Sequence, residues 1–246
     1  MIQIKGLVCL PHTFIKDNLM NNQEFLEQEK DRLLQHPLFE DDFITAVSSL
    51  KIFEIEKAKK FALLYYPHIL RTRLYQASTL GITPDENIQF VLSEIIHDEY
   101  GLGDITRSHM QQYRKFMYAL GLNDEQFREP IIIPELAHYI EVMTRLTQSK
   151  SWLAAVAAVG VASEHIIPKY YQLLLQGLRN IPSVKDDDLE LFIGHIDLDI
   201  EHSRMVEGAL LPYLDNDQNR KEFSEGLDIN MQVRREFHAG LYRELF

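Results

Sequence analysis

The chain has 246 residues, a formal net charge of -12 at pH 7 and a pI of about 5.3. A chain this acidic repels phosphate backbones, and no basic stripe compensates, so nucleic acid is excluded as a partner. Cys9 is the single cysteine, which excludes an internal disulfide. Residues 1–10 lack the pattern of a signal peptide, and no apolar run approaches the roughly 20 residues that cross a bilayer. We therefore expect a cytoplasmic protein without membrane attachment.

Helical spacing of apolar residues dominates the chain, and strand patterns are almost absent. This spacing predicts helices over residues 22–36, 41–80, 83–100, 108–120, 135–148, 150–167, 170–178, 186–214 and 217–246. The second should bend at Pro67 and close at Gly81. The third should begin with Thr83 as its cap and Pro84 at its first helical position. Residues 124–134 indicate a connecting loop.

No repeat, low-complexity tract or long linker divides the chain. Apolar residues make up 46% of it, which is sufficient for one buried core. The sequence therefore predicts an all-α protein, a single helical bundle over residues 1–246. Residues 1–21 are expected to form an extended N-terminal segment packed on this bundle.

A stripe of possible ligands lies in the helix predicted over residues 186–214. His195, Asp199 and His202 stand at positions i, i+4 and i+7, which share one helix face. Two imidazoles and a carboxylate on one face suit a first-row transition metal. A solvated polar face with two histidines is an equally good interpretation of this stretch alone.

Two further carboxylates extend this pattern. Glu99 ends a predicted helix and His109 begins the next, and the glycines at 101 and 103 allow the chain to turn back between them. Glu164 ends an apolar, small-sided stretch, where a buried carboxylate would cost several kcal/mol unless it is paired or metal-bound. Taken separately, an ordinary solvated helix end is favoured for Glu99, and a surface salt bridge is the alternative for Glu164.

Together these residues resemble the ligand pattern of the heme-oxygenase-like di-iron oxidases and oxygenases. That pattern is a Glu, a later His, a second Glu on a central helix, and a His-x3-Asp-x2-His helix. The residues of this chain that occupy these places, in order, are Glu99, His109, Glu164, His195, Asp199 and His202. The resemblance spans roughly residues 22–214. It implies a bundle with the fold of heme oxygenase that holds two Fe(II) ions and no heme.

The resemblance also implies an iron-dependent oxidoreductase that uses O2 as co-substrate on a small organic molecule. N-oxygenation, desaturation and oxidative carbon–carbon cleavage all occur in the family, so the reaction type stays open. Two ferrous ions and three carboxylates leave the site slightly cationic, which suits a substrate carboxylate. Candidates to anchor that carboxylate are Arg71, Arg73, Lys169 and Tyr170. The sequence is also compatible with a homodimer.

Three alternatives remain open at this stage. A ferritin-like di-iron site would pair Glu94 and His97 with Asp199 and His202, but it leaves His195 without a role. A metal-free enzyme acting on a small heterocycle, like the TenA and PqqC relatives of this fold, would use the histidines at 109, 195 and 202 as substrate contacts. A third alternative is a partner-binding protein. Metal content separates the second and third alternatives from the di-iron hypothesis.

Overall fold

Residues 12–246, the part of the chain that the computed structural model describes, contain helices and no strand. The α-helices are α1 (His12–Leu34), α2 (Asp42–Ser49), α3 (Ile55–Ile69), α4 (Thr72–Ile82), α5 (Glu86–Glu99), α6 (His109–Ala119), α7 (Asp124–Phe127), α8 (Pro134–Thr147), α9 (Trp152–Val156), α10 (Ser163–Leu178), α11 (Glu190–Leu210) and α12 (Asp217–Leu245). Shorter 3-10 or π segments are η1 (Pro37–Glu40), η2 (Ile105–Arg107), η3 (Ala157–Ala162), η4 (Asp186–Leu189) and η5 (Leu211–Tyr213). The predicted all-α fold is confirmed.

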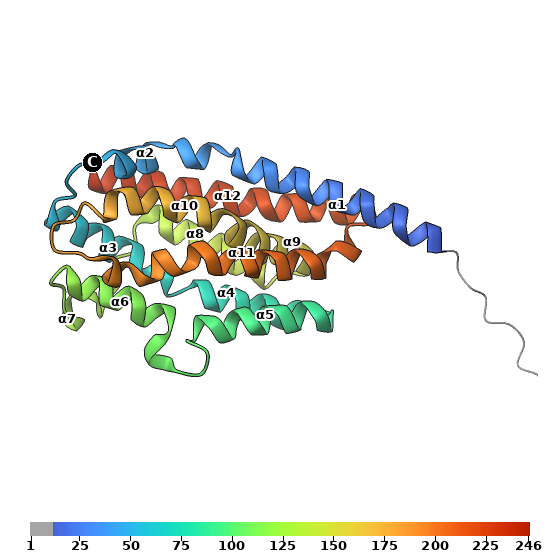
Figure 1. Ribbon diagram of the computed structural model, residues 1–246, viewed down its shortest axis with the longest axis horizontal. Helices are drawn as coiled ribbons and strands as arrows, with labels where there is room; N and C mark the ends of the chain where they lie inside the picture. Colours follow the sequence, from blue (N-terminus) through green and yellow to red (C-terminus); the bar gives the residue numbers. More distant parts are fainter. Residues whose placement is uncertain (1–11) are drawn as a thin grey trace, which may run out of the picture.

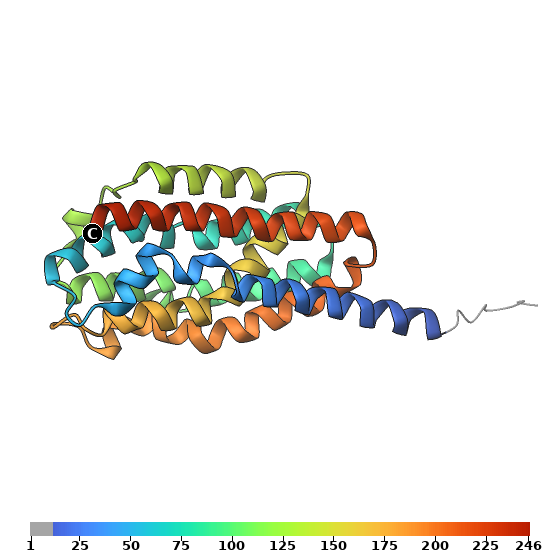
Figure 2. The same ribbon diagram turned by 90° about the horizontal axis from the view of Figure 1, so that it is seen from above.

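The long helices run side by side along the longest axis of the molecule (Figures 1 and 2). Helix α10 packs on α11 and on α2, whereas α12 packs on α8, α9 and η3. On its other side α11 contacts α5 and α6. Helix α11 is therefore held between α10 and the α5–α6 pair, so side chains from all four helices reach one interior region. None of the helices in residues 12–246 is long and apolar enough to span a bilayer.

The first helix begins earlier than its predicted start at residue 22. Helix α1 starts at His12, so residues 12–21 are helical, and the prediction of an extended segment there is wrong. The physical reason is local, because no proline or glycine stands between Pro11 and Pro37 to interrupt the helix. The first turns of α1 project past the end of the bundle (Figure 1). Residues 1–11, and with them Cys9, lie outside the described residues.

The start of α5 also differs from the prediction. Asp85, rather than Thr83, caps this helix, and its Oδ1 accepts hydrogen bonds of 3.0 Å from the backbone N–H groups of Asn87 and Ile88. Thr83 instead donates from its hydroxyl to the carbonyl of Thr79 at 2.7 Å, so it belongs to the end of α4. The shift of two residues does not change where α5 ends, which is the end that carries Glu99.

The two helices predicted over residues 150–167 and 170–178 are one continuous helix made of α9, η3 and α10. The middle part, η3, is a π-helix of six residues that ends directly before α10, where Glu164 is the second residue. A wider π turn changes the direction of the side chains that follow, and such turns are frequent at functional sites. Gly160 lies in this turn, and a Cβ atom there would stand 2.8 Å from Cγ1 of Val206. Glycine therefore allows α11 to approach the helix just before Glu164.

Candidate metal centre

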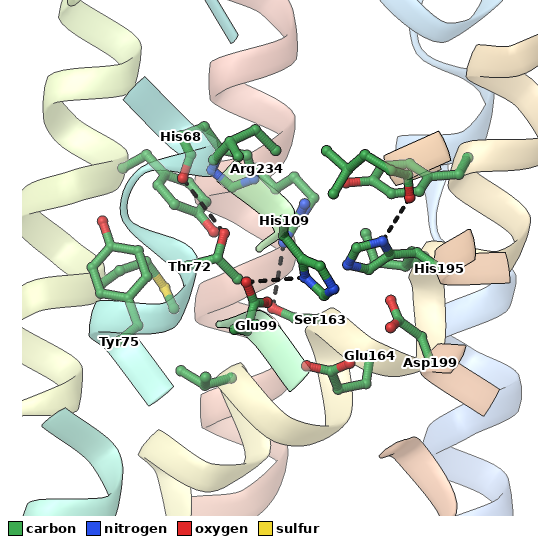
Figure 3. A pocket seen from close by; sticks show the side chains of 17 residues that line it. His68, Thr72, Tyr75, Glu99, His109, Ser163, Glu164, His195, Asp199 and Arg234 are labelled. Atoms are coloured by element: carbon green, nitrogen blue, oxygen red, sulfur yellow. Dashed lines mark hydrogen bonds and ion pairs between the residues drawn. The ribbon is translucent and has the colours of Figure 1, made fainter. Parts of the chain in front are cut away.

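The six residues predicted as ligands come together in two groups of three. One group is Glu99, His109 and His195, and the other is Glu164, Asp199 and His202; within each group the candidate ligand atoms lie within 4.8 Å of one another. Five of the six line one cavity, where their side chains point toward one another (Figure 3). His195 is half-buried, and the other five are buried. Their role as metal ligands stays a prediction, but their convergence is a property of the fold.

A tight turn between α5 and α6 brings the first group together. Gly101, Leu102 and Gly103 all have positive φ angles, of 80°, 55° and 90°. A Cβ atom at Gly101 would stand 2.3 Å from the carbonyl oxygen of Asp104, so the turn requires glycine there. As a result Nδ1 of His109 lies 3.1 Å from Oε2 of Glu99. The glycine break predicted from the sequence therefore has the expected effect.

Helix α11 supplies one histidine to each group, and each is oriented through its second ring nitrogen. Nδ1 of His195 lies 2.6 Å from the carbonyl oxygen of Leu191 and must donate to it, because a carbonyl can only accept. Its Nε2 is therefore the free acceptor. Nε2 of His202 donates to Oδ2 of Asp98 at 2.9 Å. Partners of this kind fix the tautomer of metal-binding histidines in proteins.

The second group has a similar internal geometry. Nδ1 of His202 lies 3.4 Å from Oε2 of Glu164 and 3.7 Å from Oδ1 of Asp199. On its other oxygen Glu164 accepts a hydrogen bond of 3.1 Å from Nε2 of Gln76, a residue on α4 that is 1% exposed. Glu164 and His202 therefore each have one outer contact and one atom that faces the group.

The residues fit a pair of transition-metal ions. Nδ1 of His109 is buried and has no hydrogen-bond partner, although Oε2 of Glu99 is only 3.1 Å away. Two ligand atoms that share one ion have this relationship, because both point their lone pairs at the same position. The donor sets, two imidazoles with one carboxylate and one imidazole with two carboxylates, are those that iron and manganese accept.

Burial and the close carboxylates shift the pKa values in the two groups in different directions. Burial, and then the neighbouring His109, lower the pKa of His195 to about 3, so this imidazole is neutral. Burial also disfavours the imidazolium of His202, but its contacts with Asp199 and Glu164 outweigh burial and raise its pKa to about 11. Burial and the adjacent Glu164 raise the pKa of Asp199 well above its ordinary value. The second group therefore holds its protons more tightly than isolated side chains would.

Sequence reasoning missed two residues that support the ligands. Asp98, which pairs with His202, is a fourth carboxylate that the charge balance of the predicted site did not include. It was adjacent to Glu99 in the sequence, and this neighbourhood was the only signal. Gln76, the partner of Glu164, lies in the middle of α4 and carries no local signal.

The ferritin-like alternative is not what the chain builds. Glu94 and His97 are both exposed on the outer face of α5, whereas Glu99 on the same helix is buried. A Glu-x-x-His pair on this helix would need to face the interior to bind an ion, and the helix is rotated so that it does not. His97 therefore belongs to neither ligand group and does not line their cavity.

None of the four proposed carboxylate anchors lines the cavity. Arg71 and Lys169 are exposed, Arg73 contacts the sulfur of Met110 at 3.7 Å, and the hydroxyl of Tyr170 bonds to His238 at 3.0 Å. The basic residue that does line the cavity is Arg234 on α12, together with His68 on α3. Both were missed, because no local pattern distinguishes either residue from the other polar residues of its helix.

Solved structures of low sequence identity share this fold. A CADD-like protein of unknown function from Nostoc punctiforme matches 92% of this chain and 99% of its own, with a TM-score of 0.74 and 14% identity. A domain of unknown function with a heme oxygenase-like fold from Shewanella denitrificans matches 96% and 93%, with a TM-score of 0.69 and 13% identity. A TenA homolog from Pseudomonas syringae matches 92% of each chain, with a TM-score of 0.65 and 14% identity. The expected heme oxygenase-like fold is confirmed.

Sequence comparison adds a family. The chain is 27% identical over 210 residues to the 4-chloro-allylglycine synthase of Streptantibioticus cattleyicolor, an alignment that covers 83% of this chain and 77% of the relative. The family described as iron-containing redox enzymes matches residues 59–235, which include both ligand groups. The match extends over more than half of the chain. The chain therefore belongs to the heme oxygenase-like family of iron-containing redox enzymes.

Proposed function

We propose that this protein is a non-heme di-iron oxidase or oxygenase that uses dioxygen to oxidise a small organic substrate. The observation that carries the proposal is the pair of buried three-residue groups around one cavity. Two groups with mixed nitrogen and oxygen donors match two ions better than one. Six protein ligands over two ions also leave coordination positions open, as a catalytic site needs.

In this proposal Glu99, His109 and His195 hold one ion, and Glu164, Asp199 and His202 hold the other. Two ferrous ions bound there supply the electrons that reduce dioxygen. The protein residues around them orient and insulate the site. Asp98 and the Leu191 carbonyl keep each α11 histidine in one tautomer. Apolar side chains, those of Met143, Val159, Ile167 and Leu191, also line the cavity and limit access of water.

The similarity to 4-chloro-allylglycine synthase narrows the class of reaction. Allylglycine is an amino acid with a carbon–carbon double bond, so the named product of that relative is an unsaturated amino acid. By analogy we favour desaturation or oxidative carbon–carbon cleavage over N-oxygenation for this chain. The relative also favours a small carboxylate-bearing substrate, because the product that its name gives is an amino acid.

Metal binding tests the proposal directly. Chelator-treated protein titrated anaerobically with Fe(II) should bind close to two ions per chain, and oxygen exposure should then give a transient visible absorption and oxygen uptake. Glu164→Ala should remove at least one ion while the helical circular-dichroism signal is kept. The matched control is His97→Ala, which changes an exposed residue two positions from Glu99 and should bind iron as the wild type does.

Two outcomes would contradict the proposal. Absence of iron binding would favour the metal-free enzyme or the partner-binding protein instead. If His97→Ala loses iron and Glu164→Ala keeps it, the ligand groups are assigned wrongly.

A further inference from the structure

Arg234 is a buried cation without a counter-ion. It lies on α12, is 3% exposed and lines the same cavity as the ligand groups. Its guanidinium makes two long hydrogen bonds of 3.4 Å, from Nε to Oδ1 of Asn230 and from Nη2 to Oγ of Ser163. Among residues 12–246 no carboxylate forms an ion pair with it. Arginine stays protonated in proteins, so the cavity contains a permanent positive charge.

The tyrosines around Arg234 do not neutralise this charge. Tyr139 lies with its ring 6.0 Å from the guanidinium carbon, and Tyr65 and Tyr170 belong to the same buried cluster. Burial raises the pKa of each of these tyrosines above its usual value, so their hydroxyls remain neutral. A buried charge without a partner destabilises the fold unless a ligand of opposite charge binds to it. An anionic ligand is therefore the simplest partner for Arg234.

One more polar group in this cavity is buried and has no partner. Nδ1 of His68 makes no hydrogen bond, and the residue is 6% exposed. It comes from α3, on the side of the cavity opposite His195 and Asp199 (Figure 3). Buried polar groups are normally satisfied, so groups left open in a cavity indicate the position of a polar ligand.

We propose that Arg234 binds the carboxylate of the substrate, with His68 as an additional hydrogen-bonding group in the same cavity. The substrate class is a compact carboxylic or amino acid. Guanidinium binds carboxylates through two parallel hydrogen bonds, which suits an acid better than a neutral amide. This inference rests on the proposed function, because it treats the cavity beside the ligand groups as the substrate site.

The dimensions of the site limit the size of this substrate. Arg234 contacts Ser163, and the next residue in the chain is Glu164 of the second ligand group. Because neighbouring Cα atoms are about 3.8 Å apart, a carboxylate at Arg234 lies only a short chain away from that group. The cavity has a volume of about 50 Å³. A cavity of about 150 Å³ holds benzene, so a small acid binds here with some movement of the lining side chains, whereas a long-chain acid would need the helices to move.

Calorimetric titration of the full chain, treated with chelator, tests the proposal without relying on iron. The probes are butyrate, hexanoate and L-norleucine, each compared with its amide, which lacks the carboxylate. The wild type should bind at least one acid. Its affinity for the corresponding amide should be lower by roughly tenfold or by a larger factor. Arg234→Met should weaken binding of that acid roughly thirtyfold or more, as loss of one partner of a buried charge pair does. Arg234→Lys keeps the charge without the planar fork and should fall between the two.

Stability separates a binding role from a structural one. If the role of Arg234 is to bind a ligand, Arg234→Met should melt at the same temperature as the wild type or above it, because the substitution removes an unpaired buried charge. The matched control is Arg243→Met, which removes an exposed arginine on the same helix and should not change binding. Equal binding of an acid to wild type and Arg234→Met, or failure of every acid to bind the wild type, overturns the inference.

Iron stoichiometry is measured on the same samples. Arg234→Met should bind as much iron as the wild type, since Arg234 belongs to neither ligand group. Absence of iron binding in both the wild type and Arg234→Met would contradict the di-iron proposal. It would not affect the result on carboxylate binding. Normal iron binding without any Arg234-dependent acid binding would contradict only this inference.

Discussion

The carboxylate of Asp98 lies 2.9 Å from Nε2 of His202, a residue 104 positions further along the chain. This contact joins the end of α5 to the middle of α11, and it leaves Nδ1 of His202 facing Glu164 and Asp199. The first prediction follows from it. Asp98→Ala should weaken metal binding by about 10- to 100-fold, as removal of such an outer partner typically does, because the imidazole loses its fixed tautomer.

Competition titration with a metal-binding dye measures this change. His97→Ala, at the adjacent exposed position, is the control and should leave the affinity unaltered. Asp98→Asn should fall between the two, because its amide oxygen can still accept the hydrogen bond but carries no charge. An affinity that is the same in Asp98→Ala and wild type would show that His202 does not depend on Asp98.

The second prediction concerns protons. The pKa of His202 is raised to about 11, so the metal-free protein holds this imidazole protonated at neutral pH. A metal ion needs the neutral form, so binding must release this proton, and metal affinity should rise with pH between about 7 and 10. The same shift stabilises the metal-free fold fully below the ordinary histidine pKa of about 6.5, and this stabilisation is lost as pH rises through about 11.

Calorimetry in buffers of different ionisation enthalpy counts the protons released when metal binds. A count near zero at neutral pH would contradict the predicted protonation of His202. His195 provides the internal contrast, because its pKa is lowered to about 3 and it has no proton to release at that pH.

The third prediction concerns the turn that places His109. Gly101→Ala should destabilise the fold by about 2 kcal/mol or more, because alanine disfavours a φ of +80° and its Cβ would meet the carbonyl of Asp104. Displacement of His109 should also remove the ion of the first group. Chemical denaturation and iron stoichiometry, which should fall from two toward one, report the two effects. Gly81→Ala is the matched control, since nothing lies within 4 Å of a Cβ atom there.

Local patterns in the sequence were sufficient for most of the helices, and the family resemblance was needed to join the six predicted ligands into one set. The i, i+4, i+7 spacing of His195, Asp199 and His202 places them on one helix face in any packing. Gly101 and Gly103 indicate a turn by their conformational freedom alone. These features are properties of single segments, which is why a sequence carries them.

Contacts between distant segments could not be predicted in this way. Gln76 and Arg234 are each one of several polar residues on α4 and α12, and only the packing of those helices turns them toward Glu164 and the cavity. Arg71 and Lys169 were chosen as anchors because they are basic, but charge alone does not decide which side of a helix faces inward. The start of α1 at His12 was missed because a polar segment without breakers has no clear helical period.

The last prediction tests the electrostatic conflict inside the second group. Burial, and then Glu164, raise the pKa of Asp199 well above its ordinary value, so its ionised form is disfavoured in the folded metal-free protein. A carboxyl whose pKa is raised by folding reduces stability once the pH exceeds its unfolded pKa of about 3.9. Asp199→Asn should therefore raise the melting temperature of the metal-free protein by a few degrees at neutral pH. The difference should shrink as the pH is lowered toward 4.

Added Fe(II) should reverse the order of stability. The wild type gains stability from the ion that neutralises Asp199 and Glu164, whereas Asp199→Asn lacks the ligand and should gain less. Asp197→Asn removes the same charge from an exposed position on α11, so it controls for net charge and should change neither melting temperature. If Asp199→Asn melts below the wild type without metal, Asp199 stabilises the metal-free fold through His202. Folding would then lower the pKa of Asp199 and not raise it.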